Sequence, residues 1–249
     1  MKILVALAQV PDTETKVKVA ADGKSLDPAD VKWITSVYDE YALEEALKQK
    51  EALGAEVTAI SVGDDKAKDV LRNALALGAD NAVLLKGDGG GDPLAIATLI
   101  AGYAKDKGFD LVFAGNKGVG GDNAAVGPML AELLGVAQAN VVVKFELADG
   151  KFRAEREIEG GTEVVVGALP AVITAQKGLN EPRYASLKGI MAAKKKTIEE
   201  LDGSAATPAI AVSSLTLPPP RAEGRKLEGD AAGQAKALLQ ALRDEAKVF

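Results

Sequence analysis

A glycine-rich segment is the part of this sequence whose residue types and spacing best suit chemistry. Residues 110–123 read Asp-Leu-Val-Phe-Ala-Gly-Asn-Lys-Gly-Val-Gly-Gly-Asp-Asn, a strand pattern followed by a loop with four glycines. Backbone N–H groups of such a loop and the dipole of a following helix can hold a phosphate. We expect Asp122 to be the N-cap of that helix, and Pro128 to set its regular start or kink it.

The spacing of these glycines limits the kind of nucleotide site. It matches neither G-x-G-x-x-G after a first strand nor G-x-x-x-x-G-K-[ST]. A standard NAD site and a P-loop are therefore disfavoured, and a plain flexible loop is the alternative to phosphate binding.

Two absences narrow the chemistry further. The 249 residues include no Cys and no His. The chain therefore has no disulfide, thiolate nucleophile, Cys-ligated cluster, imidazole base or His-ligated haem. We expect no catalytic side chain and no metal site, so that any redox role must come from a bound cofactor.

Three other groups invite functional interpretations. The run Gly87–Gly91 matches no phosphate-binding spacing and is interpreted as a plain loop before a helix that starts at Asp92-Pro93. Glu44–Glu45 could suggest acid–base work, but nearby lysines predict a solvated helix face. The basic cluster Lys194–Lys196 has no interleaved aromatic residues, which favours a protein partner or solvation over nucleic acid.

Charge and hydropathy exclude further classes. The chain has 30 basic and 36 acidic residues, a net charge of −6, and only 4% aromatic residues. This balance opposes binding to a nucleic-acid backbone, and no apolar run approaches the roughly 18 residues that span a membrane. The apolar start at residues 1–7 is interpreted as a first buried strand of an unprocessed, intracellular chain.

The first half of the chain alternates short apolar runs with amphipathic stretches. This rhythm predicts a doubly wound, mostly parallel sheet. The expected strands are Ile3–Leu7, Val57–Val62, Ala82–Leu85 and Asp110–Ala114. The expected helices are Val37–Leu53, ended by Gly54, then Lys66–Leu77, and a third from Pro93 to about Lys107.

The second half predicts added antiparallel strands and an arm. Strand patterns at Asn140–Leu147, Phe152–Ile158, Glu163–Ala168 and Ala171–Ala175 are separated by the turn sequences Asp149-Gly150 and Glu159-Gly160-Gly161. Residues 202–230 include three consecutive prolines and predict an extended arm, followed by a helix over Ala231–Lys247 with one apolar face. The fold class is therefore α/β: a Rossmann-like, mostly parallel sheet with antiparallel additions and a C-terminal arm ending in a helix.

Two long motifs give the chain a family resemblance. Residues 154–165 (Ala-Glu-Arg-Glu-Ile-Glu-Gly-Gly-Thr-Glu-Val-Val) and 179–187 (Leu-Asn-Glu-Pro-Arg-Tyr-Ala-Ser-Leu) resemble the electron transfer flavoprotein β subunit. The resemblance covers about residues 1–200. It departs at Ala8-Gln9, Pro128 and Ala192, where relatives often carry Lys-Arg, Gln and Lys.

This resemblance implies a heterodimer with an electron transfer flavoprotein α subunit, which holds most of the FAD. Residues 1–192 would form the nucleotide-binding domain that buries AMP, with a recognition loop at about 179–192. Residues 193–249 would dock on the α subunit. Electrons would arrive from acyl-CoA and other dehydrogenases of fatty acid β-oxidation and leave to a quinone oxidoreductase, in a bacterial cytoplasm or, in a eukaryote, the mitochondrial matrix.

Two alternatives stay open. One is a bifurcating β subunit of the same family, which binds a second FAD in place of AMP and uses NADH. The other is a stand-alone regulatory domain that binds ATP or AMP.

The resemblance also assigns site residues. The cofactor-binding positions would be Ala6, Ser36, Val37, Tyr38, Asp39, Val62, Gly115, Asn116, Lys117, Gly118, Val119, Gly120, Gly121, Asp122, Asn123, Ala124, Ala125 and Val126. The partner-recognition positions would be Arg183, Tyr184, Leu187, Ile190 and Met191. Leu187 would be an apolar anchor for the dehydrogenase; its alternative is a core leucine in a short helix.

Overall fold

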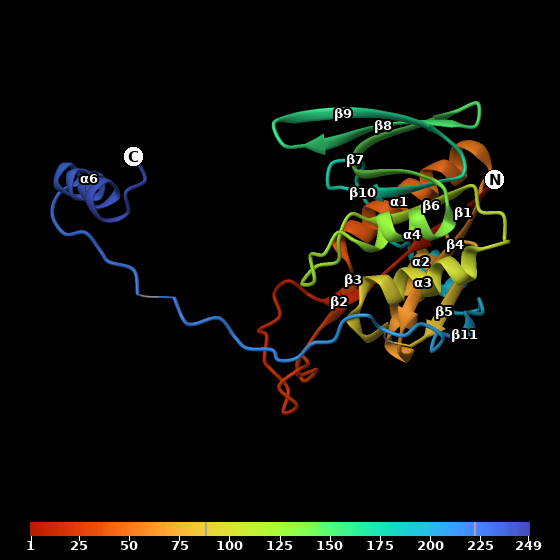
Figure 1. Cartoon of the computed structure of the whole chain (residues 1–249), viewed down its shortest axis with the longest axis horizontal. Helices are drawn as coiled ribbons and strands as arrows, with labels where there is room; N and C mark the ends of the chain where they lie inside the picture. The colour runs from red at the N-terminus through yellow and green to blue at the C-terminus, as the bar shows by residue number, and fades with distance from the viewer. Residues whose placement is uncertain (88, 222) are drawn as a thin grey trace. The chain divides into compact units, whose positions relative to one another are not determined.

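A nine-stranded sheet organises the chain in the computed structural model, which describes residues 1–87, 89–221 and 223–249 (Figure 1). Its strands lie in the order β11-β5-β4-β1-β6-β10-β7-β8-β9. Their bounds are β1 Lys2–Ala6, β4 Glu56–Gly63, β5 Asn81–Lys86, β6 Leu111–Gly115, β7 Ala137–Ala148, β8 Lys151–Ile158, β9 Gly161–Ala168, β10 Ala171–Ala175 and β11 Glu199–Asp202. A separate two-stranded ribbon pairs β2 (Gln9–Pro11) with β3 (Trp33–Thr35).

Helices cover both faces of this sheet. They are α1 Val37–Leu53, α2 Lys68–Leu77, α3 Pro93–Ala104, α4 Val126–Leu134 and α5 Leu187–Ala193. A further helix, α6, spans Ala231–Gln240. Short 3₁₀ turns are η1 (Asp65–Ala67) and η2 (Gly89–Gly91). The α1 bounds match the prediction, including a left-handed Gly54 after its last residue.

The central strand β1 shows why the sheet has two covered faces. Ile3 and Val5 pack into one apolar core with residues of α1 and α2. Leu4 and Ala6 alternate with them and pack into a second core with residues of α3 and α4. β1 pairs in parallel with both β4 and β6. The predicted doubly wound, mostly parallel sheet is therefore confirmed.

The antiparallel additions lie at one edge. β8 pairs antiparallel with β7 and with β9. Asp149 and Gly150 connect β7 to β8, and both adopt positive φ angles (51° and 71°), as a two-residue hairpin turn requires. β10, which the sequence grouped with these strands, instead inserts in parallel between β6 and β7.

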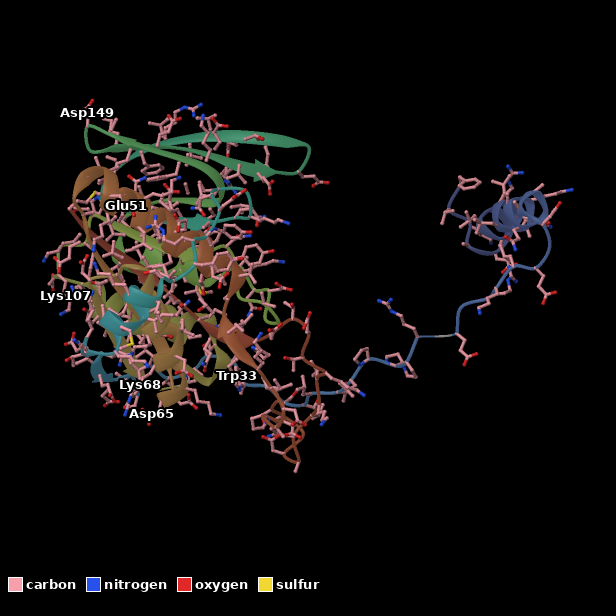
Figure 2. The ribbon with its side chains drawn as sticks, turned by 180° about the vertical axis from the view of Figure 1, so that it is seen from behind. Trp33, Glu51, Asp65, Lys68, Lys107 and Asp149 are labelled. Atoms are coloured by element: carbon pink, nitrogen blue, oxygen red, sulfur yellow. The ribbon has the colours of Figure 1, made fainter. Side chains whose placement is uncertain are left out.

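The opposite edge holds β11, which sequence analysis did not predict. All four of its residues are exposed, so no apolar alternation marks it as a strand. Its Glu200 forms ion pairs with Lys68 (2.8 Å) and Lys86 (2.7 Å), which in turn pair with Asp65. Figure 2 labels Asp65 and Lys68 at this edge. These charges attach β11 to β5 and to the start of α2.

The chain divides into two compact units, Met1–Leu215 and Thr216–Phe249. The second unit carries α6, whose residues are not buried, and the chain continues from it as a π-helical turn over Ala241–Glu245. Ala222, within the predicted arm, lies outside the described residues. The functional division at residue 192 stays a prediction. Among the described residues, no helix combines the length and apolar character needed to cross a membrane.

Two helical glycines provide a matched test of this packing. A Cβ at Gly127 in α4 would overlap Thr174 Cγ2, whereas a Cβ at Gly102 in α3 would meet nothing within 4 Å. Thr174 is fully buried and its Oγ1 accepts from the Val141 N–H, so it has little freedom to move. We expect Gly127→Ala to lower the free energy of unfolding by about 1–3 kcal/mol. We expect Gly102→Ala to raise it by about 0.5–1 kcal/mol. Chemical denaturation measures both, and equal effects would contradict the packing.

Candidate functional site

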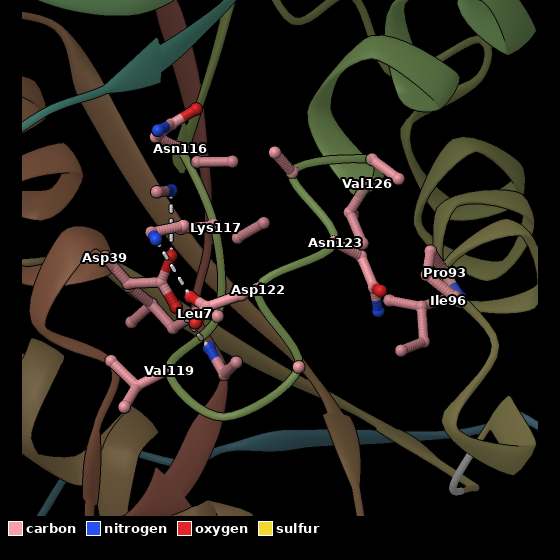
Figure 3. Close-up of a pocket in the computed structure, with 18 of the residues that line it drawn as sticks. Leu7, Asp39, Pro93, Ile96, Asn116, Lys117, Val119, Asp122, Asn123 and Val126 are labelled. Carbon is pink, nitrogen blue, oxygen red and sulfur yellow. Dashed lines mark hydrogen bonds and ion pairs between the residues drawn. The ribbon is translucent and has the colours of Figure 1, made fainter. Parts of the chain in front are cut away.

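A pocket opens at the carboxyl edge of the parallel strands, beside the starts of α1, α3 and α4 (Figure 3). Its walls come from the ends of β1, β4 and β6, from the loop after β6 and from the first turns of those helices. From β1 the chain first adds β4 and β5 on one side of the sheet, and it then crosses to the other side of β1 to add β6. The carboxyl ends of β1, β4 and β6 therefore mark the point where the strand order reverses. Ligands of open α/β sheets bind at such a point.

A buried carboxylate joins the segments that form the floor of the pocket. The backbone N–H of Ala8 donates to Asp39 Oδ2 (2.7 Å), and that of Gly115 donates to Asp39 Oδ1 (2.8 Å). Asp39 is only 6% exposed. Burial raises the pKa of its carboxyl to about 7, although both N–H donors oppose the shift. Asp39 therefore connects the start of α1 to the chain after β1 and to the end of β6.

Gly115 allows α1 to approach β6 this closely. A Cβ at this position would overlap the Asp39 carboxylate and the backbone of Tyr38 and Asp39. The glycine is thus required by a backbone contact rather than by an unusual φ angle.

The loop after Gly115 has backbone angles suited to an anion. Gly120, Asp122 and Ala124 have positive φ angles of 96°, 50° and 48°, at every second residue. Such alternation turns successive N–H groups toward one side and forms a concavity for an anion. A left-handed alanine is uncommon, and strain of this kind gathers at functional sites.

An ion pair within this loop involves the aspartate that was expected to cap the next helix. Lys117 Nζ pairs with Asp122 Oδ1 (3.1 Å), and this hydrogen bond raises the pKa of Lys117. The predicted N-cap role of Asp122 is wrong, because α4 begins later, at Val126, with Ala125 in the N-cap position. Pro128 then lies in the first turn of α4, close to the helix start as predicted.

Three helix N-termini reach the pocket, and one of them is open. α1 carries Asp39 and Glu40 in its first turn, and α3 is capped by Asp92, which accepts from the Leu94 N–H. α4 has neither a side-chain cap nor an acidic residue in its first turn. Its N–H groups and dipole therefore favour an anion from outside the chain.

The structure brings most of the predicted cofactor residues together. Those that line the pocket are Ala6, Asp39, Val62, Gly115, Asn116, Lys117, Gly118, Val119, Gly121, Asp122, Asn123, Ala124, Ala125 and Val126. Those outside its lining are Ser36, Val37, Tyr38 and Gly120. Tyr38 instead lies near the loop, with its ring centroid 5.8 Å from Lys117 Nζ. That the lining residues bind a cofactor stays a prediction.

Several residues that line the pocket were not predicted from the sequence. Leu7, Ala8, Gly91, Pro93, Ile96 and Ile100 also line the pocket. The plain-loop interpretation of Gly87–Gly91 therefore needs correction at Gly91; Asp88 lies outside the described residues. The position of this run after a strand and before Asp92-Pro93 was the available signal, because parallel strands end at one edge of the sheet. Figure 3 shows Asn123 and Val126 facing Pro93 and Ile96 on this side.

A second feature is an exposed apolar segment around α5. Tyr184 is 97% exposed and Leu187 77%, and Ile190 and Met191 are also exposed. Leu187 begins α5, but it is not the core residue of the alternative interpretation. Arg183 instead folds back onto α1.

The predicted solvated face at Glu44–Glu45 is wrong. Both glutamates are buried, at 7% and 1% exposure. Glu44 pairs with Arg183, and Glu45 pairs with Lys48. Arg183, which pairs with Glu44, and Asn180, which donates to Glu45, come from far along the chain, so no local pattern reveals these contacts.

Comparisons with known proteins agree on one family. The electron transfer flavoprotein domain model matches residues 25–206. The chain is 42% identical to the electron transfer flavoprotein subunit beta of Bacillus subtilis over the full length of both. It is 38% identical to that of Syntrophomonas wolfei, covering all of this chain and 98% of that one. It is 39% identical to the mitochondrial subunit beta of Oryza sativa subsp. indica over both full lengths.

Two glycine substitutions test the geometry of the pocket. Gly115→Ala must displace the start of α1, so we expect a loss of about 1–3 kcal/mol in unfolding free energy and weaker nucleotide retention. Gly161→Ala is the control, because this glycine lies outside the pocket lining and a Cβ there meets nothing within 4 Å. Thermal unfolding and analysis of released nucleotide check both variants. Equal behaviour of the two would contradict the contact between α1 and β6.

Proposed function

This chain belongs to the electron transfer flavoprotein β-subunit family, and from that premise we propose that it pairs with an α subunit and buries AMP in the pocket at the carboxyl edge. The FAD of the heterodimer is held mainly by the α subunit. The β subunit then acts as the non-catalytic half of an electron carrier, in a bacterial cytoplasm or, in a eukaryote, the mitochondrial matrix.

The open N-terminus of α4 is the observation that carries the AMP assignment. The loop with alternating positive φ angles leads directly into this helix, so backbone N–H groups and dipole act on the same point. We assign the phosphate to this point. The apolar side chains of Val62, Ile96 and Ile100 on the wall suit the adenine base. Lys117 can exchange part of its pairing with Asp122 for the phosphate.

The raised pKa of Asp39 fits an anionic ligand in the same pocket. A permanently ionised carboxylate would repel a phosphate, whereas a carboxyl that titrates near neutrality can hold a proton. We assign the AMP a structural role, because it would fill the space between α1, α3 and the loop after β6.

The flavin supplies the electron-transfer chemistry when it is bound. The residues of this chain bind the nucleotide, shape the surface that the α subunit covers and present a docking site. Among the described residues, no group of three or more Asp or Glu side chains could hold a metal ion.

The exposed apolar segment supports the proposed exchange of electrons with other proteins. We assign Leu187, Tyr184, Ile190 and Met191 to the surface that docks acyl-CoA and related dehydrogenases. A small apolar contact suits a transient complex, and a quinone oxidoreductase then accepts the electrons.

Cofactor content tests the nucleotide assignment. We expect the co-expressed heterodimer, once denatured, to release one FAD and one AMP, since the pocket of this chain suits a single phosphate at one helix terminus. Chromatography of the released nucleotides against standards measures this. Two FAD without AMP would select the bifurcating alternative, and a heterodimer without flavin would refute the carrier role.

Shortening the side chain of Leu187 tests the proposed docking surface. We expect Leu187→Ala to raise the KM for an acyl-CoA dehydrogenase about tenfold, because truncating a central apolar anchor costs more than about 1 kcal/mol. Stopped-flow reduction of the flavin measures it, with AMP content as a check on integrity. Leu53→Ala, at an exposed leucine at the end of α1, is the matched control and should leave KM unchanged. Equal KM values for the Leu187 variant and the native heterodimer would refute the anchor.

A further inference from the structure

A partly buried ion cluster lies directly behind the exposed apolar segment. Arg183 Nε and Nη2 donate to the two carboxylate oxygens of Glu44 (2.8 and 2.9 Å), and its Nη1 and Nη2 donate to Glu51. The backbone N–H of Arg183 donates to Glu44 as well (3.1 Å). Figure 2 labels Glu51, on the last turns of α1. One arginine thus joins the segment to α1 through both its main chain and its side chain.

Exposure changes abruptly at this arginine. The Glu44 side chain is 8% exposed, whereas Tyr184, the next residue after Arg183, is 97% exposed. Arg183 is therefore hydrogen-bonded to α1 immediately before the chain presents this exposed tyrosine. Its forked geometry fixes the direction of that turn, which a single point charge would not.

A second contact holds the segment just before Arg183. Asn180 Nδ2 donates to the Tyr41 carbonyl (3.0 Å) and to Glu45 Oε2 (3.1 Å). Glu45 is almost fully buried. The entry of the segment is therefore held to α1 at two successive points.

The far end of the segment is held to α2. A Cβ at Gly189 would overlap the Ala76 carbonyl oxygen, so α5 lies directly against the last turn of α2. Arg72 Nη1 donates to the carbonyls of Ala193 and Lys196 (both 2.6 Å). The exposed side chains between these ends therefore project from a segment that is already ordered.

Order in the free protein matters for a transient contact. A mobile segment would lose conformational freedom at each docking event, and this loss would reduce the affinity of a small interface. A segment ordered in advance avoids that loss. Removing Arg183 would also leave Glu44 as a buried charge without its partner.

We propose that Arg183 is a positioning residue: paired with the buried Glu44, it fixes residues 180–186 so that Tyr184, Leu187 and Met191 meet the dehydrogenase already ordered. This inference rests on the proposed docking function. It places Arg183 behind the interface rather than in it.

The test compares Arg183 variants of the intact heterodimer with an acyl-CoA dehydrogenase that reduces the native form. We expect Arg183→Ala to raise KM about fivefold and to leave kcat, FAD and AMP content unchanged, because only docking is affected. Backbone hydrogen exchange over 180–193 should accelerate. Arg183→Lys keeps the charge without the fork, and a rise of about twofold is expected. This milder variant carries the test if Arg183→Ala folds poorly.

Glu51→Gln is the matched control, because Glu51 is exposed and Glu44 remains to hold Arg183. Its KM should stay at the native value. When Leu187 is already replaced by Ala, the additional change Arg183→Ala should raise KM little further, since both residues act through one surface.

The outcomes separate the two hypotheses. Native KM and native exchange in Arg183→Ala, while Leu187→Ala still raises KM, would overturn the positioning role and leave the docking function standing. A fully additive double variant would also overturn it, because Arg183 would then contact the partner itself. An unchanged KM in Leu187→Ala would overturn both.

Discussion

The carboxylate of Asp39 is the constraint on which the pocket depends. It accepts backbone N–H groups from Ala8 and Gly115, and it lies in the first turn of α1. Three segments that are distant in sequence are thereby joined at the carboxyl edge of the sheet. The cost of burying this group appears in its pKa, which is raised to about 7. Gly115 is the corresponding requirement on β6, because only a residue without Cβ leaves room for the start of α1.

Helix α1 connects the two surfaces to which we assign functions. Its first turn lines the pocket through Asp39, and its later turns hold the exposed apolar segment through Glu44 and Glu45. The packing of the same helix against the sheet therefore sets the geometry of both surfaces. A cofactor-binding subunit that must also present a partner surface gains from such sharing, because an ordered core positions each surface without added elements.

Much of the fold could be predicted from the sequence because it follows from local patterns. The periodicity of residues 37–53 and the β-branched run at 57–62 specify α1 and β4. The glycine loop after β6 could be located in the same way. Local patterns could not show that Glu44 and Glu45 are buried, since their partners Arg183 and Asn180 lie more than a hundred residues away. Nor could they show β11, whose exposed residues pair through the backbone and through ion pairs. Gly91 and Pro93 could be assigned to the pocket only from the order of the strands, which places their segment at the same edge of the sheet as the loop after β6.

The central claim is that a nucleotide phosphate lies on the loop between β6 and α4. Hydrogen exchange of the intact heterodimer, before and after removal of its nucleotide, tests this most directly. The account predicts that the amides of residues 116–126 lose protection when the nucleotide leaves, because their N–H groups face its phosphate. Unchanged exchange at these residues, with the loss of protection at the amino edge of the sheet around Thr58 and Tyr103 instead, would contradict it.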